Sequence, residues 1–421
     1  MASSSNSARL IYHREMGSVD TTVSASTAVM DLERAYLLQN YSRYPMVLKR
    51  GKGCWLWDIS GKRYLDLISG IGVNSLGHAH PRIMRVIKEQ ASLLIHSSNL
   101  YYHEYQGPLA KKLSETSGMQ RTFFCNSGTE AVECAVKMAH GHGRRLRDDK
   151  FEIVALENSF HGRTVGALSI TGQPKYRKDF EPLMPGVKFV NVCDEAAFEA
   201  AVTDRTAAIF VETIQGEGGI YPISAEWLRK ARELADRHNA LLVFDEIQCG
   251  IGRPGTHFAY QLHTPAVMPD IVTMAKPIAC GLPLGAVLCN EKAASSIGPG
   301  MHGTTFGGGA LACRVALEFY DILDELMPQM QRVSAYFFDA LRQLQRKHSI
   351  IKDVRGFGLM IGVETAFPCR HFVRQGMEQG LLFNVTHDTV LRMLPPYILT
   401  EKEVDRAIKG LSKIFKNGKP E

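Results

Sequence analysis

Two short apolar runs decide the fold: LLVFDE at residues 241–246 and PDIVTMAKP at residues 269–277. Each has the length and hydrophobic content of a buried strand, and each leads into a charged side chain, Asp245 or Lys276. Four similar runs lie at Thr122–Cys125, Glu152–Leu156, Ala207–Glu212 and Gly285–Cys289. Helical patterns at 128–141 and 225–238 separate several of them. The alternation predicts an α/β fold with a mostly parallel sheet covered by helices, and such sheets bind ligands beyond the carboxyl ends of their strands.

The sequence on both sides of this region predicts a second, smaller domain. A chain of 421 residues is too long for one typical hydrophobic core. Residues 55–66 have the pattern of a hairpin, and the C-terminal part has long helical patterns at 311–326, 329–347 and 400–415 with short strands between them. We expect a flexible leader at 1–25, a large domain at 77–309, and a small α+β domain formed by 310–421 together with the segment 26–76.

Composition excludes several classes of function. The formal net charge is +6, but the basic residues are scattered, so we expect no nucleic-acid partner. No apolar stretch reaches the roughly 20 residues that span a bilayer, and the leader lacks the apolar core of a secretory signal, so we expect no membrane partner. The nine cysteines form no CxxC pair, which favours buried thiols and a cytoplasmic location. His78 and His80 have no third ligand close in sequence, and we expect no metal site.

A candidate phosphate site opens one of the predicted helices. Ser127, Gly128 and Thr129 follow the strand that ends at Cys125, and free N–H groups with the positive end of the helix dipole favour an anion there. For this segment alone, an ordinary serine N-cap is an equal alternative. Together with Lys276 and the strand-end aspartate, the segment favours pyridoxal 5′-phosphate. That cofactor needs a lysine for a Schiff base with its aldehyde and a carboxylate beside its pyridine nitrogen.

Other segments carry further candidate groups. Phe160 follows a strand and suits stacking on a planar cofactor, whereas Arg163 suits a bidentate contact with a substrate carboxylate. Core packing of Phe160 and a surface ion pair of Arg163 are the alternatives. Residues 212–219 end a strand in two carboxylates, Glu212 and Glu217, and their glycines indicate a loop that approaches a ligand closely.

Taken together, these segments resemble the class III aminotransferases, which are fold type I pyridoxal phosphate enzymes. The resemblance runs from about Tyr44 to Phe415. Its most specific segments are LGHAHP at 76–81, SNLYY at 98–102, FCNSGTEA at 124–131, NSFHGRT at 158–164, TGQPKY at 171–176, QGEGG at 215–219, FDEIQ at 244–248 and RMLPP at 392–396. It implies a large domain with a mostly parallel sheet, a small α+β domain from both chain ends, and a homodimer with shared active sites.

For the cofactor, the resemblance implies a role for each matching residue. Lys276 would form the Schiff base and then move a proton, and Asp245 would pair with the ring nitrogen. Gln248 would hydrogen-bond near the ring hydroxyl, and Phe160 would stack on the ring. The phosphate would be held by Ser127, Gly128 and Thr129, with Thr305 reaching it from the neighbouring subunit.

For the substrates, the resemblance implies two arginines. Arg163 would bind the carboxylate remote from the reacting amine. Glu217 would cover Arg392 while the amine donor is bound and release it for the α-carboxylate of 2-oxoglutarate. An ω-amine donor has no carboxylate beside its reacting nitrogen, so one arginine must be neutralised in one half-reaction and exposed in the next. The segment 98–102 would place Tyr101 at the substrate.

The implied reaction transfers the amino group of N2-acetylornithine to 2-oxoglutarate and gives N-acetylglutamate 5-semialdehyde and glutamate, as in arginine biosynthesis. Ornithine, succinylornithine, 4-aminobutyrate or a carrier-bound lysine derivative are alternative donors. An aminomutase, a decarboxylase or a non-catalytic relative are alternatives on the same fold. Pro277, Gly309 and His103 depart from the family pattern, and Pro277 predicts an extended backbone at Lys276.

Overall fold

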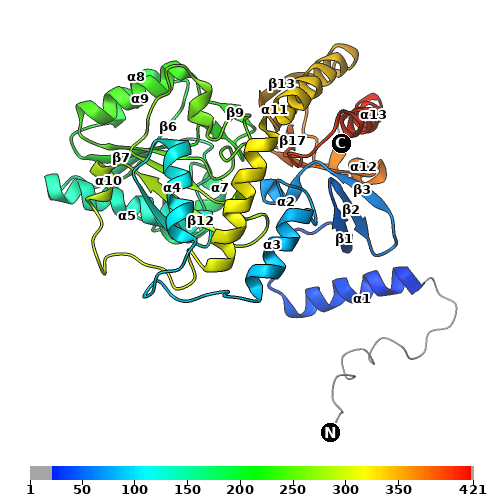
Figure 1. Cartoon of the computed structure of the whole chain (residues 1–421). Helices are drawn as coiled ribbons and strands as arrows, with labels where there is room; N and C mark the ends of the chain where they lie inside the picture. The colour runs from blue at the N-terminus through cyan, green and yellow to red at the C-terminus, as the bar shows by residue number, and fades with distance from the viewer. Residues whose placement is uncertain (1–20, 419–421) are drawn as a thin grey trace, which may run out of the picture.

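The structure, a computed structural model, describes residues 21–418 and contains two bodies. The larger body holds the middle of the chain, and the smaller one brings N-terminal strands beside the C-terminal segments (Figure 1). Residues 1–20 of the predicted leader lie outside the described residues, and helix α1 (Thr21–Tyr36) begins directly after them. This helix was not predicted. It lies apart from both bodies in Figure 1.

A seven-stranded sheet forms the centre of the larger body. Its strand order is β4 (Arg121–Cys125), β12 (Gly285–Cys289), β11 (Ile271–Met274), β10 (Leu241–Asp245), β7 (Thr206–Val211), β5 (Glu152–Leu156) and β6 (Val187–Val190). The pairs from β11 through β10, β7 and β5 to β6 are parallel. Strand β12 is antiparallel to both β4 and β11. The predicted mostly parallel sheet is confirmed. The edge strand β6 was missed because it is only partly buried and has no continuous apolar run.

Helices cover both faces of this sheet, as predicted. Along β10, Leu242 and Phe244 join one hydrophobic cluster, while Leu241 and Val243 join another on the opposite face. The helices of the larger body are α3 (Pro81–Ala91), α4 (Gln106–Ser117), α5 (Gly128–Leu146), α6 (Val165–Ser169), α7 (Pro174–Arg177), α8 (Glu195–Ala201), α9 (Ala225–Arg237) and α10 (Glu291–Ala294), of which α4, α5, α8, α9 and α10 contact strands of the sheet. Short 3₁₀ turns lie at η1 (Lys178–Phe180), η2 (Ala259–Leu262) and η3 (Lys276–Ala279).

The smaller body combines both ends of the described chain, which confirms the predicted α+β domain. The hairpin of β2 (Trp55–Asp58) and β3 (Arg63–Asp66), flanked by β1 (Leu48–Lys52), pairs through β3 with β15 (Leu381–Leu382). A second sheet has the order β13 (Ile351–Phe357), β14 (Met360–Thr365), β17 (Val390–Met393) and β16 (Asn384–Thr386). The remaining elements of the smaller body are α12 (Phe372–Glu378) and α13 (Glu401–Asn417). The short turn α2 (Ser69–Gly72) and the two-stranded ribbon of β8 (Ile214–Gln215) and β9 (Tyr221–Pro222) belong to neither of its sheets.

The C-terminal helical region differs from its prediction in one respect. We expected two helices, at 311–326 and 329–347, but one helix, α11 (Ala310–Lys347), runs through Pro328. Buried side chains on both sides of the proline hold it in place. Phe319 packs in the core of the larger body, and Phe337 packs in the core of the smaller one. The helix therefore joins the two bodies, and the domain boundary at residue 310 stays a prediction.

Candidate functional site

A cavity of about 400 Å³ lies at the carboxyl ends of the central strands. Eight of the predicted site residues line it: Ser127, Gly128, Thr129, Phe160, Arg163, Asp245, Gln248 and Lys276. They come from the ends of β4, β5, β10 and β11, which is the edge where a parallel sheet binds ligands. Within residues 21–418, no helix is both long and apolar enough to cross a membrane, and no histidine, cysteine and acidic side chains gather as a metal ion would require.

One wall of the cavity is the N-terminus of helix α5. Ser127 is its N-cap, and its Oγ accepts a hydrogen bond from Glu130 N at 3.3 Å. The N–H groups of the first turn have no partner within the helix, so this end offers donors and a positive dipole to an anion. Thr129 Oγ1 lies 2.9 Å from Thr164 Oγ1. A Cβ on Gly162, whose φ is +141°, would approach Thr129 Oγ1 to 2.4 Å, so this approach requires glycine.

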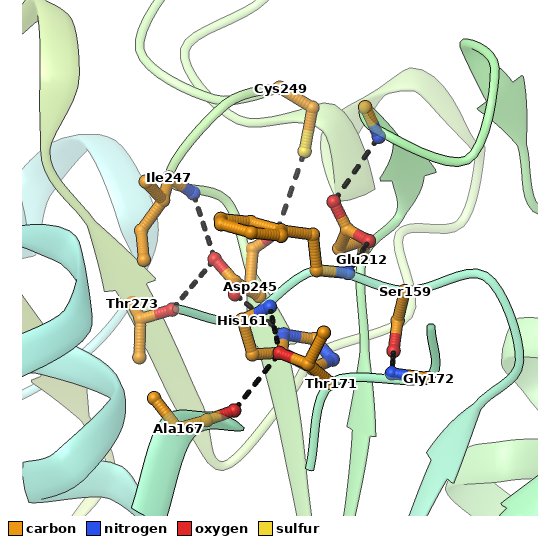
Figure 2. A network of polar contacts seen from close by, with 12 residues as sticks. Ser159, His161, Ala167, Thr171, Gly172, Glu212, Asp245, Ile247, Cys249 and Thr273 are labelled. Atoms are coloured by element: carbon orange, nitrogen blue, oxygen red, sulfur yellow. Dashed lines mark hydrogen bonds and ion pairs between the residues drawn. The ribbon is translucent and has the colours of Figure 1, made fainter. Parts of the chain in front are cut away.

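Asp245 lies at the centre of a buried polar network (Figure 2). Its Oδ1 accepts hydrogen bonds from Thr273 Oγ1 and from the backbone N–H of Ile247, both at 3.1 Å, and its Oδ2 lies 2.7 Å from His161 Nδ1. Burial favours a neutral imidazole, but the hydrogen bond to Asp245 and its charge raise the pKa of His161 above its usual value. The aspartate is therefore held in one orientation with acceptor capacity left toward the cavity.

Lys276 occupies the strand end next to Asp245, but its backbone differs from the prediction. We expected an extended conformation before Pro277, whereas φ is +43° at Lys276, in the left-handed region. Strand β11 ends at Met274 and the turn η3 starts at once, so the chain reverses at the lysine itself. Burial lowers the pKa of Lys276, and the charges of Asp245 and Glu217 offset only part of that effect. No described residue accepts a hydrogen bond from its amine.

A second charged group borders the cavity through Gln248. Arg392, on β17, is almost fully buried and donates hydrogen bonds to Glu217 and, at 2.9 Å, to Gln248 Oε1. Asn384 Oδ1 accepts from Arg392 Nε at 3.1 Å. Burial alone would raise the pKa of Glu217, but the charge and hydrogen bond of Arg392 lower it below its usual value. The two members of the predicted switch thus form an ion pair, although neither lines the cavity directly.

Two residues that line the cavity, Glu212 and His161, had no role assigned from the sequence. Glu212 is buried and accepts from Phe160 N at 2.9 Å and from Gly216 N at 3.2 Å, so it joins the segment of Phe160 to the loop of Glu217. Burial raises the pKa of Glu212 to about 7, with His161 opposing and Asp245 adding to the shift. The sequence shows Glu212 at a strand end and His161 next to Phe160, but it does not show which side chains they meet.

Three predicted residues lie toward the surface. The Arg163 guanidinium stacks 4.0 Å from the centre of the Tyr176 ring, and it has no carboxylate partner among the described residues. Tyr101 and Thr305 do not line the cavity of their own chain. Tyr101 is 71% exposed. Phe306, which follows Thr305 in the chain, is 69% exposed. The loop of Thr305 stays close to the N-terminus of helix α5, because Asn126 Nδ2 donates a hydrogen bond to Thr304 Oγ1 at 3.0 Å.

A mostly parallel sheet that presents a lysine and an aspartate at adjacent strand ends, beside a helix N-terminus, defines an α/β enzyme of the pyridoxal phosphate-dependent, fold type I class. A family model described as Aminotransferase class-III matches residues 36–415. The chain therefore belongs to the class III aminotransferases, whose members use pyridoxal 5′-phosphate.

Individual relatives agree with this family. The chain is 47% identical over 389 residues to the acetylornithine aminotransferase of Methanocaldococcus jannaschii, covering 92% of this chain and 97% of that protein. Its fold is similar to the ornithine aminotransferase of Toxoplasma gondii, with a TM-score of 0.88, 32% identity, and coverage of 96% of this chain and 99% of that one. It is also similar to the acetylornithine aminotransferase of Elizabethkingia anophelis, with a TM-score of 0.81, 31% identity, and coverage of 93% and 99%.

Proposed function

We propose that this protein transfers the ω-amino group of N2-acetylornithine to 2-oxoglutarate, and so serves arginine biosynthesis. The observation that carries the proposal is the pairing of Arg392 with Glu217 at one side of the cavity, while Arg163 is without a carboxylate at its mouth. An enzyme that alternates between an ω-amine and a 2-oxo acid needs one arginine that can be covered and one that stays available. The 47% identity to an acetylornithine aminotransferase supports the choice of donor.

The cavity residues fit pyridoxal phosphate. The first turn of α5 offers hydrogen-bond donors for a phosphate, and Asp245 offers a carboxylate acceptor at the end of β10. The amine of Lys276, which has no hydrogen-bond partner among the described residues, lies at the neighbouring strand end. Phe160 lies in the same lining, on the segment anchored by Glu212. When bound, the cofactor supplies an electron-withdrawing ring that lets an amino group move between carbon skeletons.

Lys276 is suited to hold and move a proton. Because burial lowers its pKa, a larger fraction of the amine is neutral near neutral pH than for an exposed lysine. Asp245 stays fixed by Thr273, Ile247 and His161, so it can hold positive charge on a ring nitrogen without rearrangement. We propose that Asp245 supports electron withdrawal by the ring, while Lys276 transfers the proton.

The two arginines would recognise the substrates by their carboxylates. N2-acetylornithine carries its carboxylate far from the reacting amine, where Arg163 would bind it. Glu217 neutralises Arg392 in this half-reaction, so no buried cation is left unpaired. When 2-oxoglutarate enters, its α-carboxylate would replace Glu217 at Arg392, and its second carboxylate would occupy Arg163.

A second copy of the chain would complete the site. Exposed apolar side chains surround the predicted contributors Tyr101 and Thr305, notably Leu100, Tyr102 and Phe306. Contiguous apolar groups of this kind mark an interface. A second copy bound there would bring its own Thr305 toward the N-terminus of α5 of the first copy. We also propose a cytoplasmic location, because eight of the nine free cysteines in the described residues are buried or partly buried, which suits a reducing compartment.

The test is glutamate formation from 2-oxoglutarate by the cofactor-loaded protein, with N2-acetylornithine, ornithine and 4-aminobutyrate as donors in parallel. Lys276→Ala is the control. A preference for N2-acetylornithine that the variant abolishes supports the proposal. A preference for ornithine, which the fold similarity to an ornithine aminotransferase makes the main competitor, would overturn the donor and keep the reaction. No transfer from any donor would overturn the reaction.

A further inference from the structure

The loop that carries Glu217 is docked onto the other body of the molecule. It lies between β8 and β9, and Arg355 of β13 reaches across to it. Arg355 Nε donates hydrogen bonds to the carbonyl oxygens of Gly219 at 3.0 Å and Ile220 at 3.2 Å. Its other end is held by ion pairs with Asp353 and Glu364, so the guanidinium is oriented before it meets the loop. Two backbone carbonyls are thus fixed by one cation from the smaller body.

Two further contacts hold the same loop. Thr386 Oγ1, on β16, donates to the carbonyl oxygen of Glu217 at 2.5 Å. Ile220 is fully buried against two glycines of the small-body sheet: a Cβ on Gly362 would come within 2.9 Å of Ile220 Cβ, and one on Gly356 within 3.2 Å of its Cγ2. The isoleucine therefore fills a slot that side chains at these glycine positions would close.

All of these contacts are to the backbone of the loop or to Ile220. Within residues 21–418, only Arg392 and Gln248 meet the carboxylate of Glu217. The backbone of the loop is consequently fixed at the carbonyl of Glu217 and again two and three residues later, while the side chain of Glu217 is 23% exposed. The contacts that anchor the loop are therefore separate from the contact that covers Arg392.

We propose that Arg355 is a positioning residue for the switch: it holds the loop on the small body so that Glu217 covers Arg392 whenever an amine donor is bound. This inference rests on the proposed function of the switch. A loosened loop would cover Arg392 less completely, which weakens the amine half-reaction. The half-reaction with 2-oxoglutarate needs Arg392 uncovered and would lose little.

The experiment compares the two half-reactions in Arg355→Gln. Loss of the guanidinium that holds both loop carbonyls is expected to lower kcat/KM with N2-acetylornithine about tenfold, and to change kcat/KM with 2-oxoglutarate by less than about twofold. Lys352→Gln removes a charge from the same strand without touching the loop, and is expected to behave as the wild type. Arg355→Lys keeps a cation for Glu364 but cannot bond both carbonyls as well, so it is expected to share the loss.

Hydrogen exchange of residues 216–222 gives a readout that is independent of turnover. Faster exchange is expected in Arg355→Gln and in Thr386→Val, with and without cofactor, because both remove an anchor of the loop. Equal losses in both half-reactions, or unchanged exchange in this segment, would overturn the positioning role. If the wild type transferred no amino group, the proposed function would fail, whereas the exchange result would still decide whether Arg355 holds the loop.

Discussion

His161 Nδ1 lies 2.7 Å from Asp245 Oδ2, and both residues are buried in the lining of the cavity. The hydrogen bond fixes one carboxylate oxygen, while Thr273 and the N–H of Ile247 fix the other. A carboxylate that must meet a ring nitrogen gains from such support, because its orientation is set before the ligand arrives. His161 is therefore a supporting residue of the cofactor site, although the sequence placed only its neighbour Phe160 there.

Replacing this histidine should weaken cofactor binding. In His161→Leu the carboxylate loses a charge-assisted hydrogen bond, and we expect the affinity for pyridoxal phosphate to fall by about tenfold or more. Titration of the apoprotein, followed by absorbance, measures the change. His238→Leu is the matched control, because His238 makes a similar pair with Asp204 near the surface, at 2.8 Å. Unchanged affinity in His161→Leu would contradict the supporting role.

The two arginines should differ in which substrate they affect. Arg392→Gln removes the group that Glu217 releases for 2-oxoglutarate, and we expect KM for 2-oxoglutarate to rise about 100-fold, as for loss of a strong ion pair. The half-reaction with N2-acetylornithine should change much less. Arg163→Gln should raise KM for both substrates, since both place a carboxylate there. Stopped-flow measurement of each half-reaction distinguishes the effects of the two variants. Equal effects of both variants on both substrates would contradict the assignment of Arg392 to 2-oxoglutarate and of Arg163 to both substrates.

How far the sequence predicted the site depends on whether the relevant neighbours are adjacent in the chain. The strand ends at Asp245 and near Lys276 were predicted because the end of a buried strand is visible as the end of an apolar run. The meeting of Arg392 with Gln248 joins segments far apart in sequence, and residue spacing alone does not predict it. The left-handed backbone of Lys276 was missed because the preference of a residue before proline is local, whereas the reversal after β11 is imposed by the fold.

The same distinction applies to the fold. The hairpin at 55–66 and the last helix at 400–415 were predicted from short-range patterns, and the helix start has a local cap in which Thr400 N donates to Glu403 Oε2 at 2.9 Å. Strand β15 has two residues and exists only because β3 lies beside it, so its sequence carries no pattern of its own. A proline inside a helix removes a backbone hydrogen bond, but packing of α11 in two separate cores keeps the helix continuous through Pro328.

A buried carboxyl should make stability depend on pH. Glu246 accepts hydrogen bonds from Thr213 Oγ1 at 2.8 Å and from the N–H groups of Ala259 and Tyr260 at 2.7 and 3.1 Å, yet burial raises its pKa to about 7 from 4.5. The folded state then binds this proton more tightly than the unfolded state. The contribution to stability is complete below pH 4.5 and is lost as pH rises through about 7, a change on the order of 3 kcal/mol.

Denaturant unfolding between about pH 5 and pH 8 checks this sign. The wild type should lose stability over this window from Glu246 and, in the same direction, from Glu212. Glu246→Gln should be less stable overall, because the amide NH₂ replaces an acceptor oxygen and would face a backbone N–H donor. Its stability should nevertheless fall less steeply with pH, because the amide does not titrate. Glu378→Gln, at an exposed position of α12, should keep the wild-type slope. Identical slopes in Glu246→Gln and the wild type would show that this carboxyl does not titrate in the window.

The proposed sharing of each site between two chains can be tested in mixed dimers. If Thr305 serves the phosphate of the partner chain, a Lys276→Ala chain paired with a Thr305→Ala chain contains one site with both defects and one with neither. We expect half of the sites in such a purified dimer to bind the cofactor with wild-type affinity, because the intact lysine faces the intact threonine of the other chain. The exposed position of Thr305, outside the cavity of its own chain, is the reason for this expectation.

The reciprocal pairing is the control. A chain with both substitutions, Lys276→Ala and Thr305→Ala, paired with a wild-type chain leaves each site with one defect if the threonine acts across the interface, so no site should reach wild-type affinity. If Thr305 acted within its own chain, the outcomes would exchange: the first mixture would have no intact site, and the second would have one. Because both mixtures contain the same mutations in the same numbers, a difference between them reports only which chain the threonine serves.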